Sequence, residues 1–335
     1  MKNIIITPKN NNGIDLCKFI MAFAVVAIHT QPLINCTNKY INEIFNLFVS
    51  MAVPFFFLSS GYLLAVKLQY PYQGKDDIDK IKKYLIRILK LYLLWMAIYF
   101  PIALGHYIIS KTSIITSALS TIRGLIFVGE QYNAWPLWYL LSTVYALILI
   151  ILLLQLKLTP KNILGVSLLI SVISFGLDLI MGFDEPAQPI LRLLFLLVKY
   201  SIGNGRILSG AIYIPAGMYL AHKKIPNPVN FLLLVGGFTL NFFTNNSFVS
   251  SYLLIVTSIG LFGIIQNIKL KDSSIYPQLR SMSTIIYLIH MYIFTFYYII
   301  VYKQKTYGPD SFIITSFIAC LISVIYIQIR KRVTK

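Results

Sequence analysis

The sequence predicts an all-α integral membrane protein with about ten transmembrane helices and both termini in the cytoplasm. Hydrophobic residues make up 57% of the 335 residues and charged residues only 12%, whereas roughly a quarter of the residues in a soluble domain are charged. Apolar runs of about 20 residues recur along the whole chain, and each is long enough to cross the roughly 30 Å hydrocarbon core as a helix. Lys and Arg gather in the short connections between these runs.

Ten predicted spans account for the apolar runs. They cover residues 14–33, 43–66, 85–109, 135–155, 162–182, 207–221, 228–245, 249–267, 281–302 and 311–329. Two further apolar stretches, 112–128 and 188–201, are short or interrupted by cations, so we expect interfacial or re-entrant helices there. The first run continues into polar residues and not into a small-residue cleavage site, so we expect it to remain as the first helix.

The distribution of basic residues indicates the orientation. Of the 29 Lys and Arg residues, 18 lie on the side of both termini and 8 on the other, while Lys18, Arg87 and Lys90 lie within or at the ends of predicted helices. Because cytoplasmic loops carry the excess of Lys and Arg, both termini are predicted to be cytoplasmic. The net charge of +18 therefore reports topology in a cell membrane, with the lipid bilayer as partner and no nucleic-acid partner.

The chain is predicted to be one transmembrane domain over residues 1–335. No internal repeat is visible, and no soluble domain fits between the spans. Cys17, Cys36 and Cys320 lack metal-like spacing, so no metal site is predicted. The basic tail after Arg330 fits either a complete protein or the membrane half of a longer one.

The first predicted helix carries two ionisable side chains on one stripe. Lys18 and His29 are eleven residues apart, about three helical turns and roughly 16 Å along the axis. Ionisable groups in a span usually face a bundle interior or a watery cavity. Thr30 and Gln31 follow His29 and suggest a polar cavity. In the alternative, Lys18 reaches the headgroups and pairs with Asp15, while His29 satisfies a buried hydrogen bond.

Other polar positions have a functional and a structural interpretation. Arg87 and Lys90 share a helix face that a phosphate or carboxylate could reach from the cytoplasm, although an ordinary basic helix end or phospholipid headgroups explain them too. Trp138 and Tyr139, in the run that begins at Trp135, are candidates for ligand contact or for interfacial anchoring.

Two later positions complete the candidate site. Gly203-Asn-Gly-Arg206 precedes a span, and its glycines permit either close approach to a ligand or a simple turn. His290 lies within a span, and a second intramembrane histidine makes a functional role for His29 harder to dismiss.

At these residues the sequence resembles the membrane acyltransferase family called acyltransferase 3. The Lys18 to His29 spacing matches the family's arginine and histidine in the first helix, and Arg87-Ile-Leu-Lys90 matches its Arg-x-x-Arg, with lysine replacing arginine in both places. The matching segments also include Met51-Ala-Val-Pro-Phe-Phe-Phe-Leu-Ser-Ser-Gly61-Tyr, Trp135 to Leu140, and Ile286-Tyr-Leu-Ile-His290. The resemblance covers almost the whole chain.

Within that family the sequence is most similar to the membrane halves of the serine racemases from vancomycin-resistance clusters. The likeness lies in Val-Pro-Phe-Phe-Phe, Leu-Trp-Tyr, a glycine-rich stretch before the sixth span, and the Tyr-Leu-x-His ending. The resemblance implies that the membrane half takes up L-serine for a C-terminal cytoplasmic racemase domain. Pyridoxal phosphate would belong to that domain, so no cofactor is assigned to this chain.

Three functions follow from the resemblance. In the favoured one, the site binds L-serine and lets it cross, with His29, Thr30 and Gln31 as an outer polar pocket, and with Arg87 and Lys90 drawing the carboxylate inward. In the second, acyl-CoA docks near Arg87 and Lys90, and His29 acts as the base that activates an extracytoplasmic hydroxyl. Lysine lacks the planar fork of arginine, which weakens that assignment. The third is an inactive membrane anchor.

Overall fold

The computed structural model confirms the all-α polytopic membrane fold, and it describes residues 11–72, 74–203, 205–302 and 308–333. Eight helical segments among these residues are long and apolar enough to cross a membrane, and each coincides with a predicted span. The other two predicted spans, 207–221 and 228–245, correspond to shorter helices, α9 (Ser209–Leu220) and α10 (Asn227–Phe243). Their orientation relative to the cytoplasm stays a prediction.

The chain divides into two compact units, and each is described by itself. Unit 1 comprises the described residues of Phe57–Lys224 and Asn245–Tyr252. Unit 2 comprises those of Lys9–Phe56, Ile225–Thr244 and Leu253–Lys335. The unit boundaries fall within two helices, α3 (Ala52–Ala65) and α11 (Ser247–Asn267).

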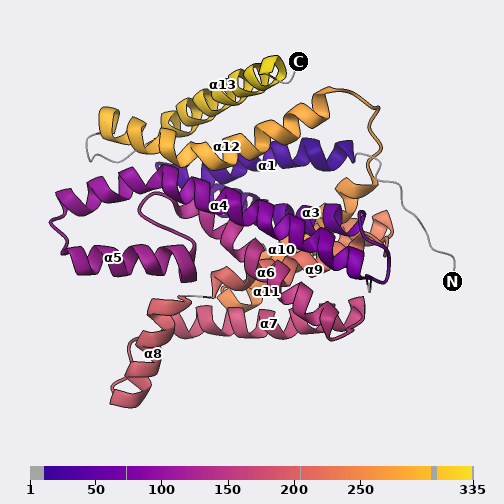
Figure 1. Ribbon diagram of the computed structural model, residues 1–335, viewed down its shortest axis with the longest axis horizontal. Coiled ribbons are helices and arrows are strands. Elements are labelled where there is room, and N and C mark those ends of the chain that lie inside the picture. Colours follow the sequence, from indigo (N-terminus) through magenta and orange to yellow (C-terminus); the bar gives the residue numbers. More distant parts are fainter. Residues whose placement is uncertain (1–10, 73, 204, 303–307, 334–335) are drawn as a thin grey trace. The chain divides into compact units, whose positions relative to one another are not determined.

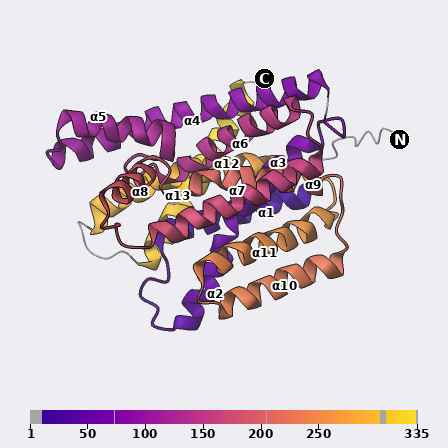
Figure 2. The same cartoon turned by 90° about the horizontal axis from the view of Figure 1, so that it is seen from below.

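Unit 1 is built around α9. Besides α9 and part of α3 it contains α4 (Lys75–Ile109), α5 (Ile114–Arg123), the π-helical turn η1 (Gly124–Val128), η2 (Trp135–Leu137), α6 (Trp138–Gln155), α7 (Pro160–Met181), α8 (Pro189–Ser201) and η3 (Arg206–Leu208). Helix α4 packs along α6, as Figure 2 shows, and both α6 and α7 pack on α9. Gly217 of α9 faces the backbone of Leu58 with no room for a Cβ, so the two helices approach closely.

The two apolar stretches left out of the predicted spans both lie in unit 1. The first forms α5 and η1, and the second forms the 13-residue helix α8. At 1.5 Å per residue, α8 is roughly 20 Å long, which is less than the hydrocarbon thickness of about 30 Å. The interfacial or re-entrant placement of both stretches stays a prediction.

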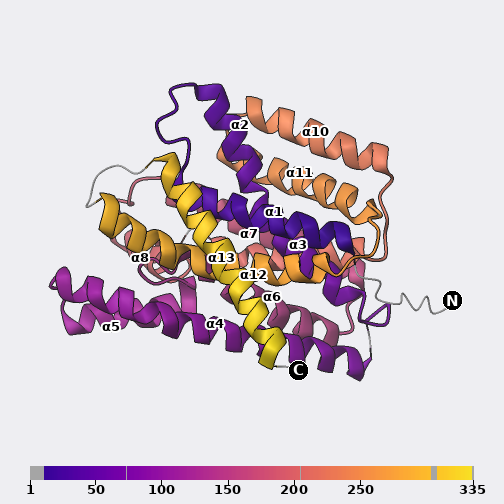
Figure 3. The ribbon, with the colours of Figure 1, turned by 90° about the horizontal axis from the view of Figure 1, so that it is seen from above.

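Unit 2 is organised by α1. It contains α1 (Asn12–Thr30), α2 (Lys39–Ser50), α10, α12 (Ile275–Tyr297), the π-helical turn η4 (Tyr298–Tyr302) and α13 (Pro309–Val333), with parts of α3 and α11. Helix α1 packs along α12 in Figure 1, α13 lies across α12 in Figure 3, and α2 packs against both α1 and α10. In this unit, the helices that contact α1 most extensively, and so surround its polar side chains, are α2, α12 and α13.

Local sequence explains where α1 begins and ends. The side chain of Asn11 accepts a hydrogen bond from the Ile14 amide at 3.1 Å, which satisfies one of the free donors of the first turn. After Thr30, Gln31 takes a left-handed conformation with φ of 44°, and its amide donates to the Ala27 carbonyl at 2.9 Å. The helix is unbroken between these caps, so the predicted register of Lys18 and His29 holds.

Candidate functional site

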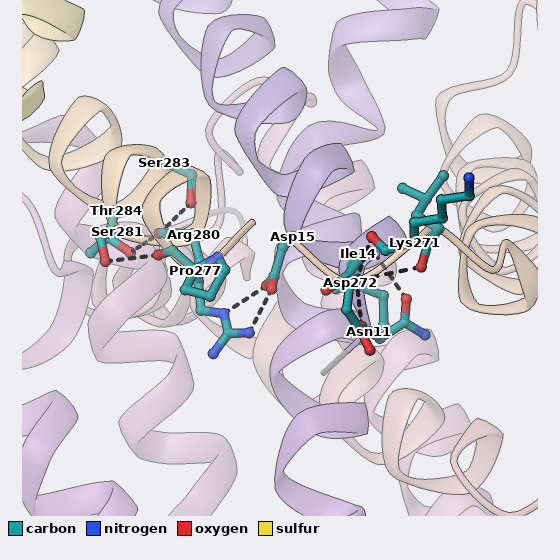
Figure 4. A network of polar contacts seen from close by, with 12 residues as sticks. Asn11, Ile14, Asp15, Lys271, Asp272, Pro277, Arg280, Ser281, Ser283 and Thr284 are labelled. Carbon is teal, nitrogen blue, oxygen red and sulfur yellow. Dashed lines mark hydrogen bonds and ion pairs between the residues drawn. The ribbon is translucent and has the colours of Figure 1, made fainter. Parts of the chain in front are cut away.

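An ion pair between a buried carboxylate and a partly exposed guanidinium joins the N-terminal parts of α1 and α12. Figure 4 shows the Arg280 guanidinium beside the carboxylate of Asp15, with Nε 2.7 Å from Oδ1 and Nη2 2.5 Å from Oδ2. Asp15 is 1% exposed. Such a two-pronged contact fixes both the distance and the orientation of the groups it joins. It therefore sets how α1 and α12 lie against each other.

Two asparagines extend this connection at the start of α1. The Asn12 Nδ2 donates to Oδ1 of Asp272 at 3.0 Å and to the Lys271 carbonyl at 3.3 Å. The Asn11 Nδ2 donates to the Gln266 carbonyl at 3.1 Å. The beginning of α1 is thus tied to the end of α11 and to the segment that leads into α12, as Figure 4 shows for part of this network.

From Lys18 to His29, unit 2 holds a continuous row of polar and aromatic side chains. The Lys18 Nζ lies 5.9 Å from the centroid of the Phe56 ring. The Phe56 ring lies 5.7 Å from that of Tyr287, which lies 6.3 Å from that of His290. We call these residues, together with His29, the α1–α12 row. Lysine over an aromatic face is an attractive arrangement that offsets part of the cost of burying the charge.

The row ends in a pair of histidines. The ring centroids of His29 and His290 are 5.3 Å apart, with the ring planes tilted by 35°. His290 is fully buried, and its Nδ1 lies 2.8 Å from the Tyr287 carbonyl and 3.2 Å from the Ile286 carbonyl. Because carbonyl oxygens only accept hydrogen bonds, the proton of a neutral His290 is assigned to Nδ1.

The second ring nitrogen of His290, Nε2, is buried and has no hydrogen-bond partner among the described residues. A buried polar atom without a partner costs stability, and such atoms in native proteins call for an explanation, of which a functional role is one. The pair thus presents a hydrogen-bond acceptor beside His29.

The two residues after His29 have separate roles. Thr30 is buried, and its hydroxyl donates to the Val26 carbonyl at 2.8 Å, so this donor serves the end of α1. The side chain of Gln31 is exposed and lines a cavity between α1 and α2. Of the three residues predicted to form a pocket, only Gln31 lines this cavity, so the pocket of His29, Thr30 and Gln31 stays a prediction.

The predicted anion site lies in unit 1. Arg87 and Lys90 are both exposed on α4, and the Arg87 guanidinium lies 5.0 Å from the ring centroid of Tyr84, one turn earlier. This stacking holds the guanidinium against the helix surface while its donors remain accessible. The geometry permits contact with a phosphate or carboxylate but does not distinguish a substrate from a lipid headgroup.

Trp138 and Arg206, predicted as separate ligand contacts, lie against each other in unit 1. The Arg206 guanidinium lies 4.7 Å from the Trp138 ring centroid and forms an ion pair with Glu130. Tyr139 shares a hydrogen bond of 2.9 Å with the Ser60 hydroxyl. These side chains thus already have protein partners.

The glycines before Arg206 form a turn. Gly203 and Gly205 have φ of 64° and 76°, and a Cβ on Gly205 would lie 2.9 Å from the Ser174 carbonyl oxygen. Both features require glycine for backbone reasons. Asn204 lies outside the described residues. The turn interpretation of this motif is therefore sufficient.

The sequence alone did not identify several residues of this site. One interpretation of the sequence pairs Asp15 with Lys18, but the structure places Arg280, within α12, against the Asp15 carboxylate. Phe56 and Tyr287 were noted only as parts of motifs. A buried aspartate in a span requires a partner, and this requirement was the one signal that pointed to a distant arginine.

Comparisons with known proteins agree with the predicted resemblance. A family model described as "Acyltransferase domain" matches residues 11–328. An amino-acid racemase from Enterococcus faecalis is 27% identical over 316 residues, which cover 89% of this chain and 42% of that protein. A second amino-acid racemase from Enterococcus faecalis is 28% identical over 145 residues, or 40% of this chain and 19% of that protein. The chain thus spans less than half the length of these relatives. No solved structure matches.

Proposed function

The chain belongs to the acyltransferase 3 family of membrane proteins, and from this premise we propose that it binds L-serine and carries it across the membrane for a cytoplasmic racemase. The likeness to amino-acid racemases suggests the cargo. Racemisation and its pyridoxal phosphate would belong to a separate cytoplasmic domain, and no residue of this chain is assigned to that cofactor.

The observation that carries the proposal is the α1–α12 row. Serine brings a carboxylate, an ammonium and a hydroxyl, and the row offers a complement to each. The Lys18 ammonium attracts the carboxylate, the face of Tyr287 attracts the ammonium, and Nε2 of His290 can accept a hydrogen bond from the hydroxyl. The row extends over roughly 16 Å of α1, so a solute that moves along it would pass from the histidine pair toward the predicted cytoplasmic end.

A second function is favoured by the histidine pair itself. In acyl transfer, His29 would take the proton of an acceptor hydroxyl. The hydroxyl oxygen would attack the thioester carbonyl of acyl-CoA, the C–S bond would break, and the thiolate would leave and take up a proton. His290 would act as a positioning residue, because its Nε2 can accept a hydrogen bond from a neighbouring N–H or O–H group.

One reconstitution experiment separates the two functions. The purified chain is placed in liposomes, and uptake of labelled L-serine and consumption of acyl-CoA are measured in parallel. We expect serine uptake by the wild type and its loss in His29→Ala. His106→Ala is the matched control, because His106 stacks on Tyr132 in unit 1 with ring centroids 3.8 Å apart and is absent from the row.

Each other outcome contradicts the proposal in a distinct way. Serine uptake that is unchanged in His29→Ala would remove His29 from transport. Acyl-CoA consumption that is lost in His29→Ala, without serine uptake by the wild type, would establish the second function. Absence of both activities in the wild type would indicate a membrane anchor.

A further inference from the structure

A cavity of about 510 Å³ lies where the end of α1 meets α2, within unit 2. Asn42, Asn46 and Ser50 line it from α2 and are spaced four residues apart, so they share one face of that helix. Gln31 contributes from the end of α1, and Phe45 and Val49 supply apolar wall. Pockets for small organic ligands typically measure about 300–1,000 Å³, so this cavity is large enough for a molecule several times the size of serine.

The cavity is separate from the histidine pair. On α1 it meets Ala27, Ile28 and Gln31, and neither His29 nor His290 is among the described residues that line it. The ring of His29 lies beside that of His290 on α12, whereas the cavity opens toward α2. The α1–α12 row therefore does not explain the polar side chains of this cavity.

The lining combines polar and apolar side chains and carries no charge. None of the described residues around the cavity is acidic or basic, so a carboxylate or ammonium inside it would lack a compensating partner. The side-chain amides of Gln31 and Asn46 make no hydrogen bond within the described residues. Each amide can donate two hydrogen bonds and accept two.

The other two polar side chains are partly engaged. The Asn42 Nδ2 donates to the Cys36 carbonyl at 2.7 Å, and the Ser50 hydroxyl donates to the Leu47 carbonyl at 2.8 Å. Both contacts use donors, so the Oδ1 of Asn42 and the lone pairs of the Ser50 oxygen remain as acceptors. The cavity thus combines free donors, free acceptors and an aromatic wall.

We propose that this cavity binds an uncharged molecule that carries hydroxyl or carboxamide groups together with an apolar face. Such groups both donate and accept hydrogen bonds, as the lining does, and the apolar face would pack on Phe45. A free amino acid is a poor match, because both of its charges would be uncompensated. The inference does not depend on the proposed transport of serine.

The test compares two probes that differ in charge. Binding of labelled N-acetylglucosamine and of glucosamine is measured by equilibrium dialysis on the full chain in nanodiscs. The two sugars differ in that an acetamido group replaces an ammonium. We expect N-acetylglucosamine to bind and glucosamine to bind at least about tenfold more weakly, since no side chain that lines the cavity carries a charge to pair with the ammonium. Absence of N-acetylglucosamine binding, or equal binding of the two sugars, would overturn the proposal.

Substitutions in the lining locate the binding. Asn46→Leu and Gln31→Leu keep similar side-chain size and remove hydrogen bonds, so each should weaken N-acetylglucosamine binding by about three- to tenfold. Both side chains are exposed, which limits damage to folding. Gln278→Leu, in α12 and outside the cavity, is the control and should bind as the wild type does.

A variant that introduces a charge controls for loss of binding through misfolding. Asn46→Asp keeps the shape of the side chain and adds a negative charge, so it should shift the preference from N-acetylglucosamine toward glucosamine. A gain of glucosamine binding cannot come from an unfolded protein. An unchanged preference in Asn46→Asp, or unchanged affinity in both leucine variants, would place the binding elsewhere and overturn the assignment.

Discussion

The two ends of the α1 and α12 pair solve the problem of burying polar groups in opposite ways. At the N-terminal end, Asp15 and Arg280 satisfy each other through a two-pronged contact, with Asn11 and Asn12 tying down the adjoining segments. At the histidine end, Nε2 of His290 is buried with no partner among the described residues. The first end has the character of a structural connection, and the second retains an unused hydrogen-bonding capacity that a ligand could fill.

This contrast predicts which substitutions should change stability and which should change activity alone. Breaking a satisfied buried pair leaves a charge without a partner, so it should cost stability. Removing an unsatisfied polar atom relieves a cost, so it should affect activity without loss of stability. The contrast can therefore be tested by measuring unfolding and serine uptake on the same variants.

The largest effect is expected for Arg280→Met. It leaves the carboxylate of Asp15, which is 1% exposed, without its guanidinium. Losing one partner of a fully buried pair costs about 3–5 kcal/mol. Because the Arg280 side chain is 39% exposed, we expect a smaller loss, of about 2 kcal/mol, which should lower the midpoint of thermal unfolding in detergent. The double variant Asp15→Leu with Arg280→Met should be more stable than Arg280→Met alone. A double variant that is no better than the single one would show that the pair is not the source of the effect.

A smaller effect, on activity alone, is expected for His290→Leu. The change removes the open Nε2 together with the Nδ1 contacts to backbone carbonyls, so the stability should stay within about 1 kcal/mol of the wild type. If the histidine pair binds the cargo, serine uptake should fall by about tenfold, which corresponds to about 1.4 kcal/mol. Unfolding and liposome uptake are the two measurements. Normal uptake in a stable His290→Leu protein would contradict the functional assignment of this end.

Asn11→Ala should have a moderate effect on stability. The variant removes the side chain that caps α1 through the Ile14 amide and that donates to the Gln266 carbonyl. Loss of a helix N-cap typically costs about 1 kcal/mol. Thermal unfolding checks the value, and Asn11→Ser, which retains a capping oxygen, should recover most of the loss. Equal destabilisation by alanine and serine would assign the effect to the Gln266 contact.

The smallest effect is expected for Thr30→Val. Its hydroxyl donates to the Val26 carbonyl of the preceding turn, which already belongs to the helix ladder. The substitution preserves shape and should change stability by about 0.5 kcal/mol or less, because a threonine that bonds back to the i−4 carbonyl stabilises a helix little. Serine uptake should be unchanged. A large loss of uptake in Thr30→Val would move Thr30 from the helix end into the binding site.

The span pattern of this protein could be predicted with little ambiguity, and the candidate site only in part. Apolar runs of fixed length must become helices in a bilayer, because backbone groups in hydrocarbon need internal hydrogen bonds. That rule does not say which of the resulting helices pack against one another. The short length of α9 was missed for a related reason. Residues 207–208 belong to the separate turn η3. Gly217 of α9 packs closely against α3 and Gly210 against α6, which hydropathy does not report.

The sequence by itself determined the helices, the shared stripe of Lys18 and His29, and the presence of a second histidine within a span. These follow from hydropathy and from the 3.6-residue repeat, which relate only residues that are near in the chain. The tertiary structure alone decided that Asp15 meets Arg280, 265 residues away, that His29 meets His290, and that α2 leaves a polar cavity beside Gln31. The physical reason is that each of these contacts depends on how one helix packs on another, and the periodicity of a single helix does not specify its neighbour.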